Sequence, residues 1–165
     1  MPYALKPAVL HDASLHATLV EMWDCGVVLC GPPGSGKSSL ALALVAAGHR
    51  LVVDDLVLVR RRCARWQGYG VPGWEGKLAL RERGVVDVRD LHGPHTTRAT
   101  ADLGAVICLC TDLPETTETT RRLTRYGLPT LNIQRSHIPQ MVAQIADWVL
   151  ALQPVTNESQ GLKTA

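Results

Sequence analysis

Long hydrophobic runs, cysteine pairs and a surplus of one charge are all missing from this sequence. No apolar segment approaches the roughly 20 residues that a membrane helix needs, so no membrane association is predicted. The opening stretch MPYALKPAVL lacks a charged start followed by a long apolar run, so no secretory signal peptide is expected. The five cysteines include no C-x-x-C pair, which disfavours a metal site and fits a reducing, cytoplasmic setting.

The charge balance argues neither for nor against a nucleic-acid partner, and we predict none. Lysine and arginine number 17 against 15 aspartates and glutamates, which leaves a net charge of +2. One basic run, made of Arg60, Arg61, Arg62 and Arg65, has no interleaved aromatic residues. That pattern favours a solvated strand end over a surface for an anionic partner.

The length and composition predict one soluble globular domain, because the chain has 165 residues, of which 46% are apolar and 19% charged. We expect this domain over residues 1–152 and a disordered tail over 153–165. Patterns of apolar, glycine and proline residues predict strands at 17–22, 26–30, 51–59, 84–88, 103–110 and 128–133, helices at 38–47, 115–125 and 138–152, and loops at 63–77 and 91–98.

The stretch GPPGSGKSS predicts a phosphate-binding loop, because it fits G-x-x-x-x-G-K-[ST] at every fixed position. Glycines let successive backbone N–H groups point into one concavity, and the following helix presents its positive N-terminal end to the same anion. Lys37 would reach the terminal phosphates, and the Ser38 hydroxyl suits a magnesium ion. A strand before the loop and a helix after it argue against a coincidental Gly-Pro loop. Nucleotide contacts are predicted for Gly31, Gly34, Ser35, Gly36, Lys37, Ser38 and Ser39.

Asp54 and Asp55 form the second element of the predicted site. The helix after the loop is about 15 Å long at 1.5 Å per residue, and after Gly48 the segment LVV runs back about 10 Å. A right-handed crossover lays this strand parallel to GVVLC, so that its aspartates arrive beside the loop. Two carboxylates there are costly unless they meet a cation or a donor. Neighbouring side chains point opposite ways, so one acid can hold a metal and the other can act as a general base. A surface turn at Asp-Asp is the alternative.

Together the two elements resemble the catalytic domain of HPr kinase/phosphorylase. The resemblance is carried by HATLVEMWDCGVVLCGPPGSGKSSLALALVAAGHRLVVDD, from His16 to Asp55, with its Gly-His-Arg turn. It continues through KLALRERGVVDVRDLHG to Arg98, which is similar to the family signature E-x-R-G-L-G-I-I-D-V, Leu-Phe-Gly and a later arginine. This resemblance implies a phosphoenolpyruvate-carboxykinase-like α/β fold, a P-loop domain whose mixed β-sheet has helices packed on it.

The resemblance implies a kinase that uses ATP and Mg²⁺ to phosphorylate a serine of HPr, the small phosphocarrier of the bacterial sugar phosphotransferase system. Many family members also remove that phosphate with inorganic phosphate and release pyrophosphate. By position, Asp54 would be the base toward the serine, and Asp55 would support the metal together with Ser38. His16 and Arg81 would complete the catalytic set. The family's hexamer makes a homo-oligomer compatible with the resemblance.

The chain departs from the family pattern at the signature glutamate, a magnesium ligand in the family, which falls on Ala79. The glycine after the signature arginine falls on Glu82. Alanine cannot ligate a metal, so either Glu82 reaches in from a shifted loop, or the metal keeps an extra water, or activity is low. The family's Gly-Arg-Asn has no clear counterpart, and Arg135 is the candidate in that region.

Two other functions stay open at this point. Ala79 favours a nucleotide-binding regulatory module that has lost phosphoryl transfer. A P-loop kinase of a small molecule would need a lid with several arginines, which residues 121–125, RRLTR, could supply. A solvated helix face explains that run equally well.

Overall fold

A mixed sheet of eight strands organises the residues that this computed structural model describes, 13–110 and 118–154. The elements are β1 (Ala13–Leu15), β2 (Thr18–Met22), β3 (Cys25–Cys30), α1 (Lys37–Ala46), β4 (Arg50–Val53), β5 (Val57–Arg62), β6 (Arg65–Tyr69), β7 (Lys77–Leu80), β8 (Gly84–Asp87), α2 (Val88–His92), the 3-10 turn η1 (Pro94–Thr96), β9 (Thr100–Cys110), α3 (Glu118–Thr124), β10 (Thr130–Gln134) and α4 (Ile138–Leu152). The strand order is β1-β5-β6-β9-β3-β2-β4, with β10 on β9, while β7 and β8 pair separately.

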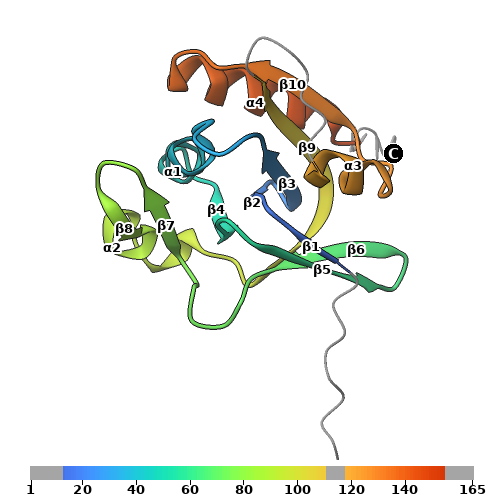
Figure 1. Ribbon diagram of the computed structural model, residues 1–165, viewed down its shortest axis with the longest axis horizontal. Coiled ribbons are helices and arrows are strands. Elements are labelled where there is room, and N and C mark those ends of the chain that lie inside the picture. Colours follow the sequence, from blue (N-terminus) through green and yellow to red (C-terminus); the bar gives the residue numbers. More distant parts are fainter. Residues whose placement is uncertain (1–12, 111–117, 155–165) are drawn as a thin grey trace, which may run out of the picture.

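The long strand β9 joins the two parts of this sheet (Figure 1). Its first residues pair antiparallel with β6, and its later residues pair in parallel with β3 on one side and β10 on the other. Strand β2 lies antiparallel between β3 and β4. Strands β3 and β4 therefore run in the same direction, as predicted, but with β2 between them.

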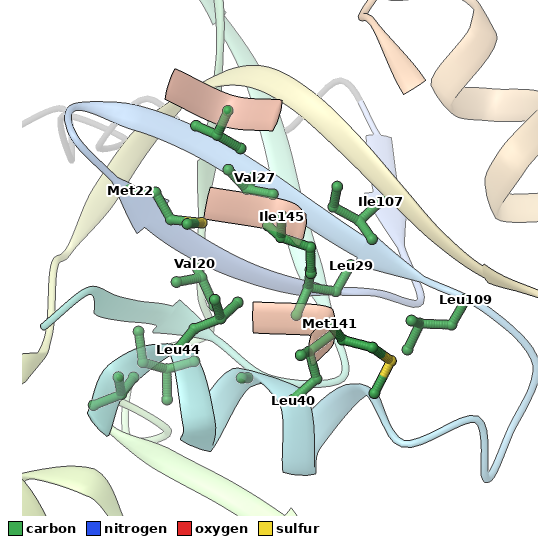
Figure 2. Close-up of a cluster of buried hydrophobic side chains, with 14 of the residues drawn as sticks. Val20, Met22, Val27, Leu29, Leu40, Leu44, Ile107, Leu109, Met141 and Ile145 are labelled. Carbon is green, nitrogen blue, oxygen red and sulfur yellow. The ribbon is translucent and has the colours of Figure 1, made fainter. Parts of the chain in front are cut away.

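One face of the sheet is covered by α1 and α4, and the side chains enclosed there form the larger core. Val20, Leu29 and Ile107 come from three neighbouring strands and are fully buried. Figure 2 shows them gathered with Leu44 of α1 and Ile145 of α4. The helix α4 has the bounds that its apolar stripe predicts, and α1 begins one residue earlier than expected.

The opposite face of the sheet encloses a second core, because β1 and β5 fold back over β2, β3 and β4. Leu19 and Val53 lie on one side of this core and Val57 and Val59 on the other. Leu123 closes it from α3. The two cores leave the C-terminal ends of β3 and β4 at one edge of the sheet, where the loop and the two aspartates follow.

Two segments differ from the expectation drawn from the sequence. Residues 51–59 form two strands, β4 and β5, because the chain turns after Val53, with Asp55 in the left-handed region at φ 69°. Residues 63–77, expected as a loop, contain β6. Its Gly68 allows close packing rather than a turn, since a Cβ there would lie 2.4 Å from Leu19 Cδ2.

Two short helical elements, α2 and η1, were not predicted from the sequence. The expected loop at 91–98 contains the end of α2 and the turn η1. The expected helix at 115–125 corresponds to α3, and its first residues lie outside the described part of the chain. The predicted disordered tail also falls outside it beyond residue 154.

The basic run lies at the exposed end of β5 and the start of β6. Arg60 donates through Nε and Nη2 to Gln67 Oε1 at 2.9 and 2.7 Å. Arg65 forms an exposed ion pair with Asp102 at 3.1 Å. These arginines interact with residues of the neighbouring strands β6 and β9, which supports the interpretation of a solvated strand end.

Candidate active site

The loop between β3 and α1 forms an open cradle for an anion. Gly34 and Gly36 have φ values of 77° and 94°, which side-chain-bearing residues rarely adopt. Gly36 precedes α1 without any side-chain cap, so the first N–H groups of the helix have no partner from a capping residue. Within the loop, Ser35 is buried and Ser39 is exposed.

Lys37 lies folded over its own loop. Its Nζ donates to the carbonyl oxygens of Gly31 at 2.9 Å and Pro32 at 3.2 Å. Burial lowers the pKa of the Lys37 ammonium below its ordinary value, while the charges of Asp54 and Asp55 act in the opposite direction. An anionic ligand would offer this ammonium stronger partners than two neutral carbonyls.

Asp54 is held by three donors from three different segments. Its carboxylate accepts a hydrogen bond from Thr18 Oγ1 at 2.7 Å and another from the Ala79 backbone N–H at 3.1 Å. Ser38 Oγ donates to the same carboxylate, at 3.1 Å from Oδ1 and 3.0 Å from Oδ2. The predicted convergence of loop and aspartate is therefore present, and Asp54 is the acid that contacts Ser38.

Asp55 follows in a different environment. It is exposed, and within the described residues its carboxylate accepts no hydrogen bond from the protein. Its left-handed backbone conformation, unlike that of Asp54, belongs to the turn into β5. Because its charge acts on the pKa of Lys37, Asp55 lies close enough to the loop to influence it. The two aspartates thus have distinct surroundings, one fixed and one free.

Two arginines approach the loop from other parts of the chain. A Cβ built on Gly34 would lie 3.2 Å from Arg81 Nη2, so this guanidinium lies directly over the loop. Arg135 Nη1 donates to the Gly34 carbonyl oxygen at 3.5 Å. Both residues are exposed, and these contacts place both guanidinium groups beside Gly34.

His16 and Thr18 lie at the start of β2. His16 is exposed in the bend before this strand, and its backbone oxygen accepts from Thr119 Oγ1 at 3.4 Å. Thr18 is fully buried against Asp54, a role that the sequence analysis did not find. The register of β2 and β4 would have indicated it, since Leu19 pairs with Val53 and places Thr18 opposite Asp54.

Ala79 lies at the site, although its side chain can hold no metal. Leu78 and Leu80 are buried on one face of β7, so Ala79 lies on the opposite, exposed face, and its backbone N–H donates to Asp54. Glu82 lies in the exposed turn between β7 and β8. The residues that the structure describes contain no group of three or more histidine, cysteine or acidic side chains able to hold a metal.

Even without a glutamate at position 79, the oxygen atoms of two other residues fit a Mg²⁺ ion that is bound together with a nucleotide. Ser38 and Asp54 bring one hydroxyl and one carboxylate within hydrogen-bonding distance of each other. Mg²⁺ is commonly held by one or two carboxylates plus substrate phosphates, with several waters kept. A complete protein cage is therefore not required here, and Ser38 and Asp54 are the residues that would hold Mg²⁺.

A strand, a glycine-rich loop, a helix and an acidic pair that directly follows a second strand define a P-loop α/β domain. The profile of the HPr Serine kinase C-terminal domain matches residues 8–148, and the chain belongs to that family. The fold expected from the sequence, phosphoenolpyruvate-carboxykinase-like with a mixed sheet, is confirmed by the match to a solved structure of the family.

Curated relatives of this chain are HPr kinase/phosphorylases, and the chain matches only part of their length. The HPr kinase/phosphorylase of Clostridium kluyveri is 35% identical over 98 residues, which are 59% of this chain and 32% of the relative. That of Streptococcus thermophilus is 36% identical over 113 residues, which are 66% of this chain and 36% of the relative. The chain thus spans about a third of the length of these relatives.

A solved structure, that of the HPr(Ser) kinase/phosphatase from Coxiella burnetii, has the same fold. It superposes with a TM-score of 0.71 at 22% identity and covers 84% of this chain and 89% of its own. None of the helices between residues 13 and 110 or between 118 and 154 has the length and apolar character needed to cross a membrane.

Proposed function

We propose that this chain transfers the γ-phosphoryl group of ATP to a serine hydroxyl of an HPr-type phosphocarrier protein. The observation that carries the proposal is the contact of Asp54 with Ser38 of the loop, with the unbonded carboxylate of Asp55 beside it. A phosphate-binding loop alone would support only nucleotide binding. A free carboxylate next to it supplies the group that a phosphoryl acceptor needs.

The hydrogen bonds favour a division of roles between the two acids. Asp54 accepts hydrogen bonds from three donors, which fix the position of its carboxylate, so it suits the binding of a cation. Asp55 is the acid with lone pairs available to take a proton from a serine hydroxyl. The sequence analysis assigned the base to Asp54 and the metal to Asp55, and we propose the reverse assignment.

Three cations would hold the phosphates during transfer. Lys37 would exchange the loop carbonyls for phosphate oxygens, and Arg81 and Arg135 would face the same group from above Gly34. With the nucleotide bound, Mg²⁺ held at Ser38 and Asp54 supplies neutralisation of the phosphate charge. Catalysis would then rest on positioning and charge, which is the usual basis of phosphoryl transfer.

Substitution of each acid separates these roles. Asp55→Asn should keep nucleotide binding and lower phosphoryl transfer by about 100-fold or more, because the proton acceptor is gone. Asp54→Asn should weaken binding of the Mg²⁺–nucleotide complex, and Lys37→Ala should abolish it. Binding is measured by calorimetry with an ATP analogue, and transfer with labelled ATP and an HPr-type protein. A wild-type transfer rate in Asp55→Asn would contradict the assignment.

A second candidate function is a nucleotide-binding regulatory module with weakened transfer. The observation in its favour is the alanine whose backbone, but not side chain, contacts Asp54. Ala79→Glu restores the acid of the family signature at this position. A large gain in transfer would mean that the natural chain is catalytically weakened. An unchanged rate would indicate that Ser38 and Asp54 already hold the metal sufficiently.

The structure offers less support for a small-molecule kinase with an arginine lid. Within residues 121–125, Arg122 donates to the Ser14 carbonyl oxygen at 2.9 Å and to Glu118 at 3.0 Å, so it serves the fold. Our proposal keeps a cytoplasmic setting, no nucleic-acid or membrane partner, and leaves phosphorolysis and homo-oligomer formation as further properties to measure.

A further inference from the structure

A cavity of about 250 Å³ is lined in part by the two aspartates that follow β4. Its lining includes Asp54, Asp55, Val71, Trp74, Lys77 and Ala79. Among the described residues, none from the loop at 31–39 lines it. Asp54 therefore borders both the phosphate loop, through Ser38, and this cavity.

The outer wall of this cavity is apolar and exposed. Trp74 is 53% exposed and Val71 is 37% exposed, so both present large hydrophobic surfaces to solvent. An exposed tryptophan beside a catalytic cleft is typical of a binding contact, since tryptophan is enriched among the residues that dominate protein interfaces. Two isolated hydrophobic residues would carry little meaning, but these two line the same cavity as Asp55, whose carboxylate accepts no hydrogen bond within the described residues.

The segment that carries this wall is held rigidly. Trp74 N donates to the Val71 carbonyl oxygen at 3.2 Å, and Lys77 N donates to the Trp74 carbonyl oxygen at 3.2 Å. From α2, Arg89 Nη2 donates to the Glu75 carbonyl oxygen at 3.0 Å. Because the backbone on both sides of Trp74 is fixed, ordering this side chain on binding costs little conformational entropy.

The small side chain of Ala79 lines the cavity and leaves space in it. The family signature has a glutamate at this position, and a side chain of that length would enter the space that the cavity occupies. Lys77 lies two residues earlier on the same face of β7, with its Nζ 5.4 Å from the centre of the Trp74 ring. The cavity is thus lined by apolar side chains, by the positively charged Lys77 and by the carboxylates of Asp54 and Asp55.

We propose that this cavity receives an apolar side chain next to the acceptor serine of the partner protein. That side chain would pack against Trp74 and Val71, and the serine hydroxyl would then face Asp55. The volume is below that of pockets for drug-sized ligands, about 300 Å³ and more, so it suits a side chain rather than a nucleotide base. This inference rests on the proposed function, because it names the acceptor side of the same site.

Binding of an HPr-type protein tests the inference without relying on catalysis. Calorimetry is performed on the full chain with a non-hydrolysable ATP analogue and Mg²⁺ present. Trp74→Ala should weaken binding of the acceptor protein by about tenfold or more, whereas Trp74→Phe, which keeps an aromatic ring, should weaken it less. The matched control is Trp23→Ala, since Trp23 is 42% exposed but packs against His49 away from this cavity.

Ala79→Leu provides an independent variant that fills the cavity without removing any contact. It should weaken acceptor binding and raise the KM for the acceptor more than it lowers kcat. Equal affinities for Trp74→Ala and Trp23→Ala, or no binding of the acceptor by the wild type, would overturn the inference. Trp74-dependent binding without any phosphoryl transfer would instead refute the proposed kinase function and leave the docking site standing.

Discussion

Thr18→Val removes a single hydroxyl group at the point where the site and the core meet. Thr18 is fully buried, and its Oγ1 donates to Asp54 Oδ1 at 2.7 Å. Valine has nearly the same shape, so the substitution leaves no cavity but withdraws one of the three donors that fix the carboxylate. The change therefore isolates the hydrogen bond to Asp54 from the packing of β2.

The size of the effect follows from the charge of the acceptor. A hydrogen bond to a charged group contributes about 1.5–3 kcal/mol to stability. Asp54 is only half-buried and keeps Ser38 and the Ala79 backbone as donors, so we expect a loss near 1.5 kcal/mol in the free energy of unfolding. Phosphoryl transfer should fall as well, because a less fixed Asp54 positions Ser38 less well.

The assay is chemical denaturation of four proteins that form a double-mutant cycle. Thr18→Val is measured in the wild type and in Asp54→Asn, and Thr18→Ser serves as the control that keeps a hydroxyl. The valine substitution should cost at least about 0.5 kcal/mol more in the wild type than in the Asp54→Asn background. Equal losses in both backgrounds would refute the reasoning, because they would show that the hydroxyl does not act through Asp54.

Two further predictions concern stability away from the loop. Glu21→Gln should lower the free energy of unfolding by about 1–2 kcal/mol, because the 8% exposed carboxylate lies between Arg50 and Arg98 at 3.9 and 3.8 Å. The same change at the exposed Glu118 should cost under about 0.5 kcal/mol in the same denaturation assay, and similar losses at both positions would contradict this. Asp87 is held by Arg89, which lowers the pKa of Asp87 from 3.8 to about 2. Its stabilising contribution should therefore be complete above pH 4 and disappear as pH falls toward 2, so Asp87→Asn should lower Tm at neutral pH but not near pH 2.

Much of the site could be predicted because its chemistry is local in the sequence. The loop motif requires glycines, a lysine and a serine at fixed spacing, and the helix and strand that flank it are short enough to return Asp54 to the loop. The long helix at the end of the described chain was equally predictable from its apolar stripe.

The other features of the site and fold depend on contacts between residues far apart in the sequence, which the spacing of residues within a motif does not reveal. Thr18 reaches Asp54 through the pairing of β2 with β4, and Ala79 reaches it through a hairpin that packs on α1. The strand β6 was missed because Gly68 looked like a loop signal, whereas it permits close packing under Leu19. The distinct environments of Asp54 and Asp55 also arise from three-dimensional contacts, so adjacent identical residues could not be told apart from the sequence.

The most direct test of the central claim is transfer of labelled γ-phosphate from ATP to the HPr-type protein of the same organism. The wild-type chain with Mg²⁺ should produce phosphoserine on that protein, identified by mass spectrometry, and Asp55→Asn should produce almost none. Nucleotide binding without any phosphoserine, under conditions where the acceptor is folded and bound, would contradict the claim that this site performs phosphoryl transfer.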